Sequence, residues 1–187
     1  SDSTLKQDES AILDPETDYE KEKHEEEKLL SEFVTDTNRS LCIARLGNVY
    51  GDVKNRGVVN HILFSLINKT QFCLNGDGKN LRDFIFVEDA VSLLSGLIHR
   101  KNFETIEMFN VCTGEGTSLM AFINHIEKMA GREIDIQNTN DKERIKSVVG
   151  NNQKILQALN ILPQHDLVSG LKKTCDNYFN HYKFNQD

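Results

Sequence analysis

Residues 75–98, NGDGKNLRDFIFVEDAVSLLSGLI, decide how the chain is expected to fold. The first four residues predict a tight turn, since Gly and Asx tolerate positive φ. Residues 84–87 form a short apolar run with β-prone side chains, and apolar residues then recur at helical spacing as far as Ile98. The stretch therefore predicts a turn, a strand and a helix in succession.

Arg82 and Asp83 stand where this turn enters the strand. A guanidinium held at a fixed place suits phosphate recognition, because Arg binds oxyanions with two parallel hydrogen bonds. The alternative interpretation is an Arg–Asp pair on the surface. The stretch alone leaves both interpretations open.

The composition sets the class of protein. With 187 residues the chain fits one domain or one and a half, and 38% hydrophobic with 27% charged residues is ordinary for a globular protein. The net charge of −7 argues against binding to nucleic acid or to an anionic membrane. We also expect no membrane span and no signal peptide, because no apolar run is long enough.

The cysteines and histidines point away from disulfides and metals. The four cysteines are far apart and form no C-x-x-C motif. Cys42, Cys73 and Cys112 lie in apolar, strand-like runs, so we expect small buried hydrophobes and a reducing, cytoplasmic setting. The six histidines are scattered, so we expect no metal site.

The N-terminal part predicts a loop over residues 1–13 and then a charged helix that starts with Asp14 as its cap. In this helix Tyr19 and Lys23 are four residues apart and share a face. An ammonium group beside a phenol favours the phenolate and lowers the Tyr pKa from about 10, which suits a general acid or base. The alternative is a chance spacing in a solvated, Lys-rich helix.

The remaining elements alternate. Residues 41–46 predict a buried parallel strand, and residues 47–51 a loop at its carboxyl end, where open α/β sheets bind ligands. Asn48 can donate and accept hydrogen bonds there. Helices are expected over residues 58–67, 118–130, 152–160 and from Asp166, strands over 71–74, 108–111 and 134–137, and a loop over 113–117. This order predicts an α/β fold with a largely parallel sheet.

Four of these stretches, in order, resemble the extended short-chain dehydrogenase/reductase family, the NAD(P)-dependent nucleotide-sugar epimerases and dehydratases. They are Y-x-x-x-K at residues 19–23, R-L-G-N-V-Y-G at 45–51, G-D-G…R-D-F-I-F-V-E-D-A at 76–90 and F-N-V-C-T-G at 109–114. The resemblance implies a partial Rossmann-like parallel sheet plus the C-terminal substrate-binding α/β lobe. Residues 1–50 would carry the catalytic helix and a strand of that sheet. Residues 51–187 would form mainly the substrate lobe, with the strand near 108–111 returning to the sheet.

The resemblance also implies roles for individual residues. Tyr19 would take a proton from a sugar hydroxyl as hydride passes to the nicotinamide of NAD or NADP, while Lys23 would lower the Tyr pKa and hold the nicotinamide ribose. Ser3, or else Thr4, would complete the catalytic triad. The nucleotide-diphosphate sugar would be held by the remaining candidates, which are Asn48, Asn60, Arg82 and Arg144.

The chain departs from the family in its glycines. None of its eleven glycines forms the Gly-rich turn that holds the dinucleotide pyrophosphate. We therefore expect the back half of such an enzyme, inactive alone, and an epimerase or reductase rather than a dehydratase, because no acidic pair stands beside Ser3. The alternative is a non-catalytic nucleotide-sugar-binding or protein-interaction module. The family also implies a homodimer through the Tyr–Lys helix, although that helix is crowded with charge here.

Overall fold

The computed structural model describes residues 6–37, 39–54, 57–101, 104–139 and 147–184, and no helix in these ranges is long and apolar enough to cross a membrane. The elements run in the order β1 (Lys6–Gln7), α1 (Asp18–Thr37), β2 (Leu41–Leu46), β3 (Asn48–Tyr50), α2 (Val58–Asn68), β4 (Phe72–Asn75), β5 (Leu81–Phe86), α3 (Val87–His99), β6 (Ile106–Val111), β7 (Gly116–Ser118), α4 (Leu119–Ala130), β8 (Ile136–Thr139), β9 (Val149–Gly150), α5 (Gln153–Leu159) and α6 (Leu167–Phe184).

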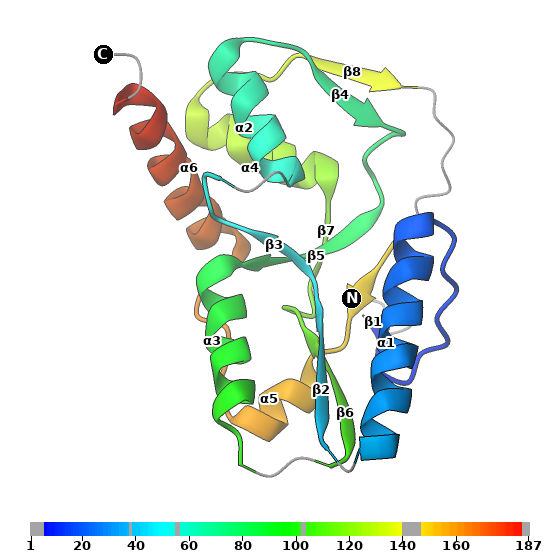
Figure 1. Ribbon diagram of the computed structural model, residues 1–187. Helices are drawn as coiled ribbons and strands as arrows, with labels where there is room; N and C mark the ends of the chain where they lie inside the picture. Colours follow the sequence, from blue (N-terminus) through cyan, green and yellow to red (C-terminus); the bar gives the residue numbers. More distant parts are fainter. Residues whose placement is uncertain (1–5, 38, 55–56, 102–103, 140–146, 185–187) are drawn as a thin grey trace.

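Parallel pairing dominates, as the sequence predicted. The pairs β2–β6, β3–β5, β4–β8 and β1–β9 are parallel, and β5–β7 is antiparallel. The β2–β6 pair is the longest, with Leu41 opposite Ile106 and Leu46 opposite Val111. Figure 1 shows α1 on one side of this pair and α3 and α5 on the other.

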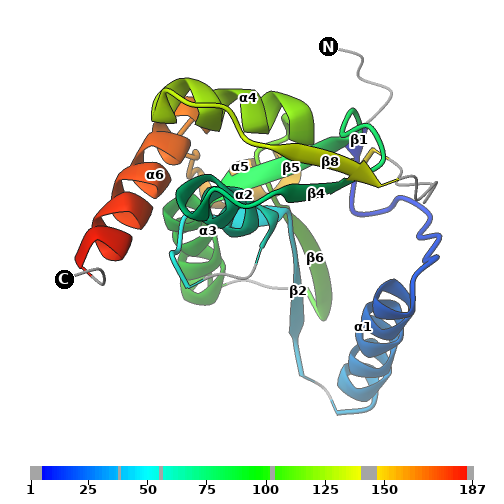
Figure 2. The same cartoon turned by 90° about the horizontal axis from the view of Figure 1, so that it is seen from above.

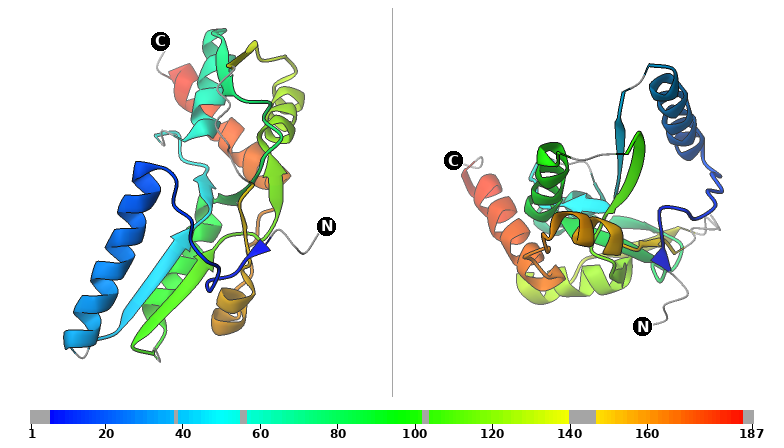
Figure 3. Two further views of the ribbon diagram at one scale, coloured as in Figure 1. Left: turned by 90° about the vertical axis from the view of Figure 1, so that its right-hand side faces the viewer. Right: turned by 90° about the horizontal axis from the view of Figure 1, so that it is seen from below.

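A second lobe lies beyond the β3–β5–β7 strands and contains α2, α4, α6 and the β4–β8 pair (Figure 1). Seen from above, α1 stands apart from the helices of this lobe (Figure 2), and the side view in Figure 3 shows it running along β2. The described residues thus form a thin strand pair with helices on both sides, joined to a compact α/β lobe.

The core is concentrated in the second lobe. One cluster joins β3, β5, α2, α4 and α6 around the fully buried Ile62, Leu63 and Phe122, while a smaller cluster packs α3 and α5 on β6 around Leu93 and Phe109. Ridges of apolar side chains at helical spacing produce both clusters. The predicted faces of α2 and α4 therefore point inward. On α3 the prediction is wrong in part: Ala90 and Leu97 are buried, but Val91 and Ile98 are 58% and 79% exposed, and Leu93 takes their place in the core.

Several local predictions hold and others are wrong. The Ser118 hydroxyl caps α4 by accepting from the Ala121 amide at 3.1 Å, and Gly131 ends that helix with a positive φ of 67°. The loops predicted over 1–13, 47–51 and 113–117 instead contain the short strands β1, β3 and β7. These strands have only two or three residues each, so their partners, rather than their own side chains, determine them.

The predicted burial of cysteines is wrong for two of three. Cys112 is buried, but Cys42 and Cys73 are exposed because they lie on the outer faces of β2 and β4. Cys175, on α6, is buried. All four thiols are free.

Candidate active site

Helix α1 begins one turn later than predicted, at Asp18, because Thr17 caps it. The Glu20 amide donates to Thr17 Oγ1 at 3.2 Å, while Glu20 Oε2 accepts from the Thr17 amide at 2.9 Å. This reciprocal arrangement is a capping box, in which two free helix amides find partners. It fixes the start of the helix directly beside Tyr19.

Tyr19 and Lys23 come together as the spacing predicted. Lys23 Nζ lies 5.8 Å from the centre of the Tyr19 ring, and the Tyr19 side chain is 68% exposed, so a ligand can reach it. Lys23 also donates to Glu26 Oε2 at 2.7 Å, and this hydrogen bond raises the pKa of Lys23. The ammonium therefore stays charged near neutral pH, beside an accessible phenol.

Arg82 lies within electrostatic reach of the same end of α1. Burial lowers the pKa of the half-buried Arg82 guanidinium, and the negative charge of Glu20 opposes that shift. Hydrogen bonds from the Thr17 and Glu16 amides lower the pKa of Glu20, and the positive charge of Arg82 adds to them. The charge of the Arg82 guanidinium on β5 thus interacts with that of Glu20, the residue after Tyr19.

Asp83 is not half of a surface pair with Arg82. Its side chain is 4% exposed and accepts hydrogen bonds from the Thr113 amide at 2.8 Å, the Thr113 hydroxyl at 2.7 Å and the Gly114 amide at 2.9 Å. Buried carboxylates need such partners. The role of Asp83 is structural, since it ties β5 to the loop after β6 and so holds the strand that carries Arg82.

Asn48 lies on the neighbouring strand. It is exposed and opens β3, where it stands opposite Phe84 of β5, two residues from Arg82. Alternate residues of a strand share a face, so Phe84 and Arg82 point the same way. The structure therefore brings the amide of Asn48 and the guanidinium of Arg82 onto adjacent strands.

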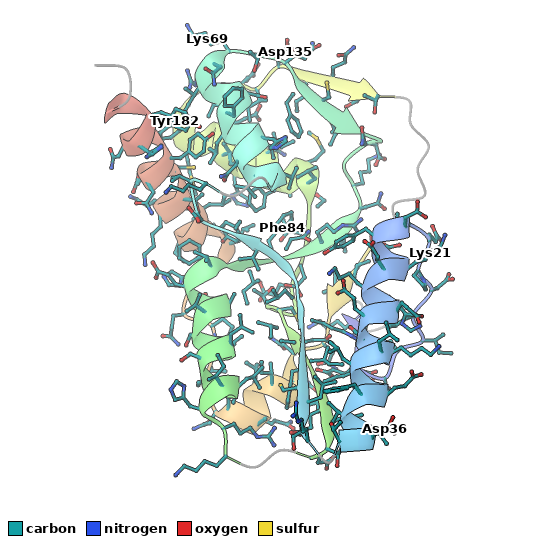
Figure 4. The ribbon with its side chains drawn as sticks, in the orientation of Figure 1. Lys21, Asp36, Lys69, Phe84, Asp135 and Tyr182 are labelled. Atoms are coloured by element: carbon teal, nitrogen blue, oxygen red, sulfur yellow. The ribbon has the colours of Figure 1, made fainter. Side chains whose placement is uncertain are left out.

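Asn60 lies elsewhere. Its side chain is 6% exposed, and Nδ2 donates to the Asp52 carbonyl oxygen at 2.8 Å. It lines a pocket of about 480 Å³ between α2, β4 and α6, which none of the other described candidates lines. Figure 4 shows Tyr182 of this pocket and Lys21 of α1 on opposite sides of the molecule. Contact of Asn60 with the nucleotide stays a prediction.

Ser3 and Arg144 lie outside the described residues. Among the described residues, Val148 forms a parallel bridge with Arg82, and Val149 pairs with Lys6 of β1. Among the ranges that the structure describes, no cluster of three or more His, Cys, Asp or Glu side chains could hold a metal.

The sequence reasoning missed the contact that anchors α1. Arg45 of β2 donates from Nε to Glu27 Oε1 at 2.9 Å and from Nη2 to Glu27 Oε2 at 2.6 Å, and Glu27 raises the pKa of Arg45. A signal was present, because Glu27 follows Tyr19 by two steps of four residues. Its partner is 18 residues away, however, and no local pattern identifies it.

Together, the parallel strands with helices on both faces and the Tyr–Lys pair on α1 define a Rossmann-like α/β protein. The profile of the NAD dependent epimerase/dehydratase family matches residues 2–112, more than half of the sequence, and the chain belongs to that family. The family predicted from the sequence motifs is thereby confirmed.

Individual relatives agree. The CDP-abequose synthase of Salmonella typhimurium is 31% identical over 137 residues, which are 69% of this chain and 45% of that protein. The dTDP-glucose 4,6-dehydratase of Bacillus anthracis, solved with NAD, superposes with a TM-score of 0.86 at 19% identity, over 96% of this chain and 57% of that one. The UDP-glucuronic acid 4-epimerase of Bacillus cereus, solved with UDP-glucuronic acid and NAD, gives 0.83 at 19%, over 96% and 60%.

The structural likenesses, at these identities, establish the fold. The chain thus spans about half the length of the relatives it matches.

Proposed function

We propose that this chain supplies the catalytic Tyr–Lys helix and the diphosphate-binding side chains of an NAD(P)-dependent enzyme that epimerises a nucleotide-diphosphate sugar. The observation that carries the proposal is the Tyr19–Lys23 pair on α1, within the part of the chain that the family profile matches, together with the charge interaction between Arg82 of β5 and the adjacent Glu20. A proton-transfer group and an oxyanion binder then serve one ligand.

In this reaction Tyr19 Oη takes the proton of a sugar hydroxyl while that carbon is oxidised to a carbonyl, and returns it when the carbon is reduced again. Lys23 stabilises the phenolate by its positive charge. Arg82 binds the diphosphate, and Asn48 hydrogen-bonds to the sugar donor. Reduction from the opposite face inverts the carbon.

The cofactor would be NAD or NADP, and when bound it would supply the hydride acceptor and donor. The nicotinamide end fits the residues present, since Tyr19 is 68% and the Lys23 side chain 50% exposed. No glycine-rich turn of this sequence fits the pyrophosphate. We therefore propose that Tyr19 and Lys23 hold the nicotinamide ribose, that Ser3 completes the triad, and that Asn60 and Arg144 contribute to nucleotide binding.

The division of labour follows the proposed domains. Residues 1–50 carry the proton-transfer helix, and residues 51–187 mainly bind the sugar nucleotide, with β6 returning to the strand pair.

The four free thiols support a cytoplasmic location. A homodimer is proposed through α1, because its outer face exposes Leu29, Leu30 and Phe33 by 50% or more. Sedimentation that gives only the monomer mass would contradict it.

Calorimetric titration of the chain with CDP-, dTDP-, GDP- and UDP-sugars, and separately with NAD, tests the function. We expect binding of at least one sugar nucleotide, unchanged by Tyr19→Phe, and no NAD binding or turnover by the chain alone. Turnover by the chain alone, abolished by Tyr19→Phe, would confirm the catalytic role and overturn the expected inactivity. Absence of binding to every sugar nucleotide would contradict the proposal. The alternative is the non-catalytic module. It would be favoured if a complete enzyme binds the sugar nucleotide and its turnover is unchanged by Tyr19→Phe.

A further inference from the structure

Helix α1 is attached to the rest of the molecule by few apolar contacts. Val34 is its one buried residue among those described, although the helix has 20 residues. The apolar side chains Leu29, Leu30 and Phe33 face outward. A helix that buries one valine is not fixed in rotation by hydrophobic packing, since nonpolar contact is not directional. Something else must set which way Tyr19 points.

The Arg45–Glu27 pair is suited to that task. Two hydrogen bonds of 2.9 and 2.6 Å form a planar fork, and the two side chains are only 21% and 24% exposed. Arg45 also donates from Nη1 to the Glu9 carbonyl oxygen at 3.2 Å. A two-pronged guanidinium–carboxylate contact fixes direction as well as distance.

The strand side of this contact is itself held rigidly. Arg45 pairs in register with Asn110 of β6, and the Asn110 amide donates to Glu9 Oε1 at 2.8 Å. Asn110 Nδ2 also donates to the carbonyl oxygens of Gln7 at 3.0 Å and of Asn151 at 3.2 Å. The guanidinium therefore projects from a framework that joins β1, β2, β6 and the segment before α5.

Helix geometry transmits this contact to the candidate site. Tyr19, Lys23 and Glu27 follow at intervals of four residues, and each such step turns about 40° around an α-helix. We propose that Arg45 and Glu27 are positioning residues, which set the rotation of α1 about its axis and thereby the place of Tyr19 and Lys23. The role in catalysis rests on the proposed function, whereas the mechanical role does not.

The experiment compares four forms of the chain: wild type, Glu27→Gln, the charge-reversed pair Glu27→Arg with Arg45→Glu, and Asp176→Asn. The last is a matched control, because Asp176 forms a 2.8 Å ion pair with Lys172 on α6. Amide hydrogen exchange is followed at residues 19–23 and in β6. The ring signal of Tyr19, assigned by its loss in Tyr19→Phe, reports the surroundings of the phenol.

In Glu27→Gln we expect exchange at residues 19–23 to rise at least about tenfold, the Tyr19 signal to shift, and β6 to remain protected. The reversed pair should recover most of both changes, and Asp176→Asn should cause neither. Unchanged exchange and an unshifted signal in Glu27→Gln would overturn the proposal. Equal loss of protection in β6 would also overturn it, because the pair would then support the whole fold.

A kinetic measurement separates this inference from the proposed function. In an enzyme assembly that turns over a sugar nucleotide, Glu27→Gln should lower kcat about tenfold and leave KM within twofold, since Asn48 and Arg82 lie on other elements. If no such turnover exists, the proposed function fails, while the exchange result still decides whether the pair positions α1. A raised KM with unchanged kcat would overturn the catalytic part of the inference.

Discussion

In the lobe formed by α2, α4 and α6, Ile62, Leu63 and Phe122 are fully buried, whereas α1 buries only Val34 along 20 residues. The lobe is stabilised by burial of apolar surface, which contributes roughly 25 cal/mol to the free energy of folding per Å² removed from water. Helix α1 is held to β2 by the Arg45–Glu27 fork, and a capping box fixes where the helix begins. The candidate proton-transfer groups thus lie on a helix with little buried apolar surface, where polar contacts specify the geometry.

The largest effect expected from this contrast is in the lobe core. Phe122 contacts Tyr50 edge-on, with ring centres 5.6 Å apart, and Phe84 with ring centres 4.4 Å apart. Phe122→Ala should reduce the free energy of unfolding by about 3–5 kcal/mol, because it leaves a cavity among these rings. Urea denaturation measures it. The control Leu30→Ala, on the exposed face of α1, should change it by less than about 0.5 kcal/mol; equal losses would refute the contrast.

A smaller effect is expected at the junction of the two regions. Both carboxylate oxygens of Asp83 accept hydrogen bonds. Asp83→Asn keeps the shape of the side chain but replaces one of these oxygens by an NH₂ group, which cannot accept. At least one backbone amide then loses its partner, so the free energy of unfolding should fall by about 2–3 kcal/mol. The exposed Asp77→Asn serves as control. Stability equal to wild type would mean that the loop after β6 does not need this carboxylate.

The sequence was informative where the determinants are local. Apolar spacing predicted α3, a hydroxyl predicted the cap of α4, and the four-residue step from Tyr19 to Lys23 predicted their contact. These features depend on residues within about one helical turn of one another. Local patterns therefore predicted most helices and the contact between Tyr19 and Lys23.

The remainder depends on partners distant in the chain. Aspartates usually lie on the surface, and Asp83 is buried because its hydrogen-bond donors come from a segment 30 residues away. The strand β3 exists because β5 lies beside it, and Cys42 is exposed because of the side of β2 on which it falls. No window of the sequence contains both halves of such contacts, so tertiary context decides them.

A third prediction sharpens the comparison at the ligand. Arg82→Gln should weaken sugar-nucleotide binding about tenfold, since a charge-assisted contact to phosphate is replaced by a neutral one. Titration calorimetry at low salt measures the affinity. Lys79→Gln is the matched control, because Lys79 lies in the adjacent turn, with its ammonium on Asp77 at 3.0 Å and an 82% exposed side chain. Equal losses of affinity in both variants would indicate that Arg82 acts only through its positive charge and makes no specific contact with the phosphate.

The smallest effects concern the thiols, and they compare buried with exposed positions directly. Burial raises the pKa of Cys112 to about 12 and that of Cys175 to about 11. Because the folded-state pKa lies above the ordinary value near 9, the stabilisation is complete below pH 9 and is lost as the pH rises toward 12. Cys112→Ala should therefore remove about 1 kcal/mol of the decline in stability between pH 8 and 10.

Thiol labelling at pH 8 tests the same contrast without denaturation. Only the thiolate reacts, so Cys73 and Cys42 should be modified in the folded chain, while Cys112 and Cys175 react only after unfolding. Cys42 should be slower than its exposure alone implies, since partial burial also raises its pKa. Modification of Cys112 at the rate of Cys73 would mean that the structure after β6 opens often enough to leave Cys112 as accessible as an exposed thiol. The region around Asp83 and Cys112 would then have no greater local stability than α1.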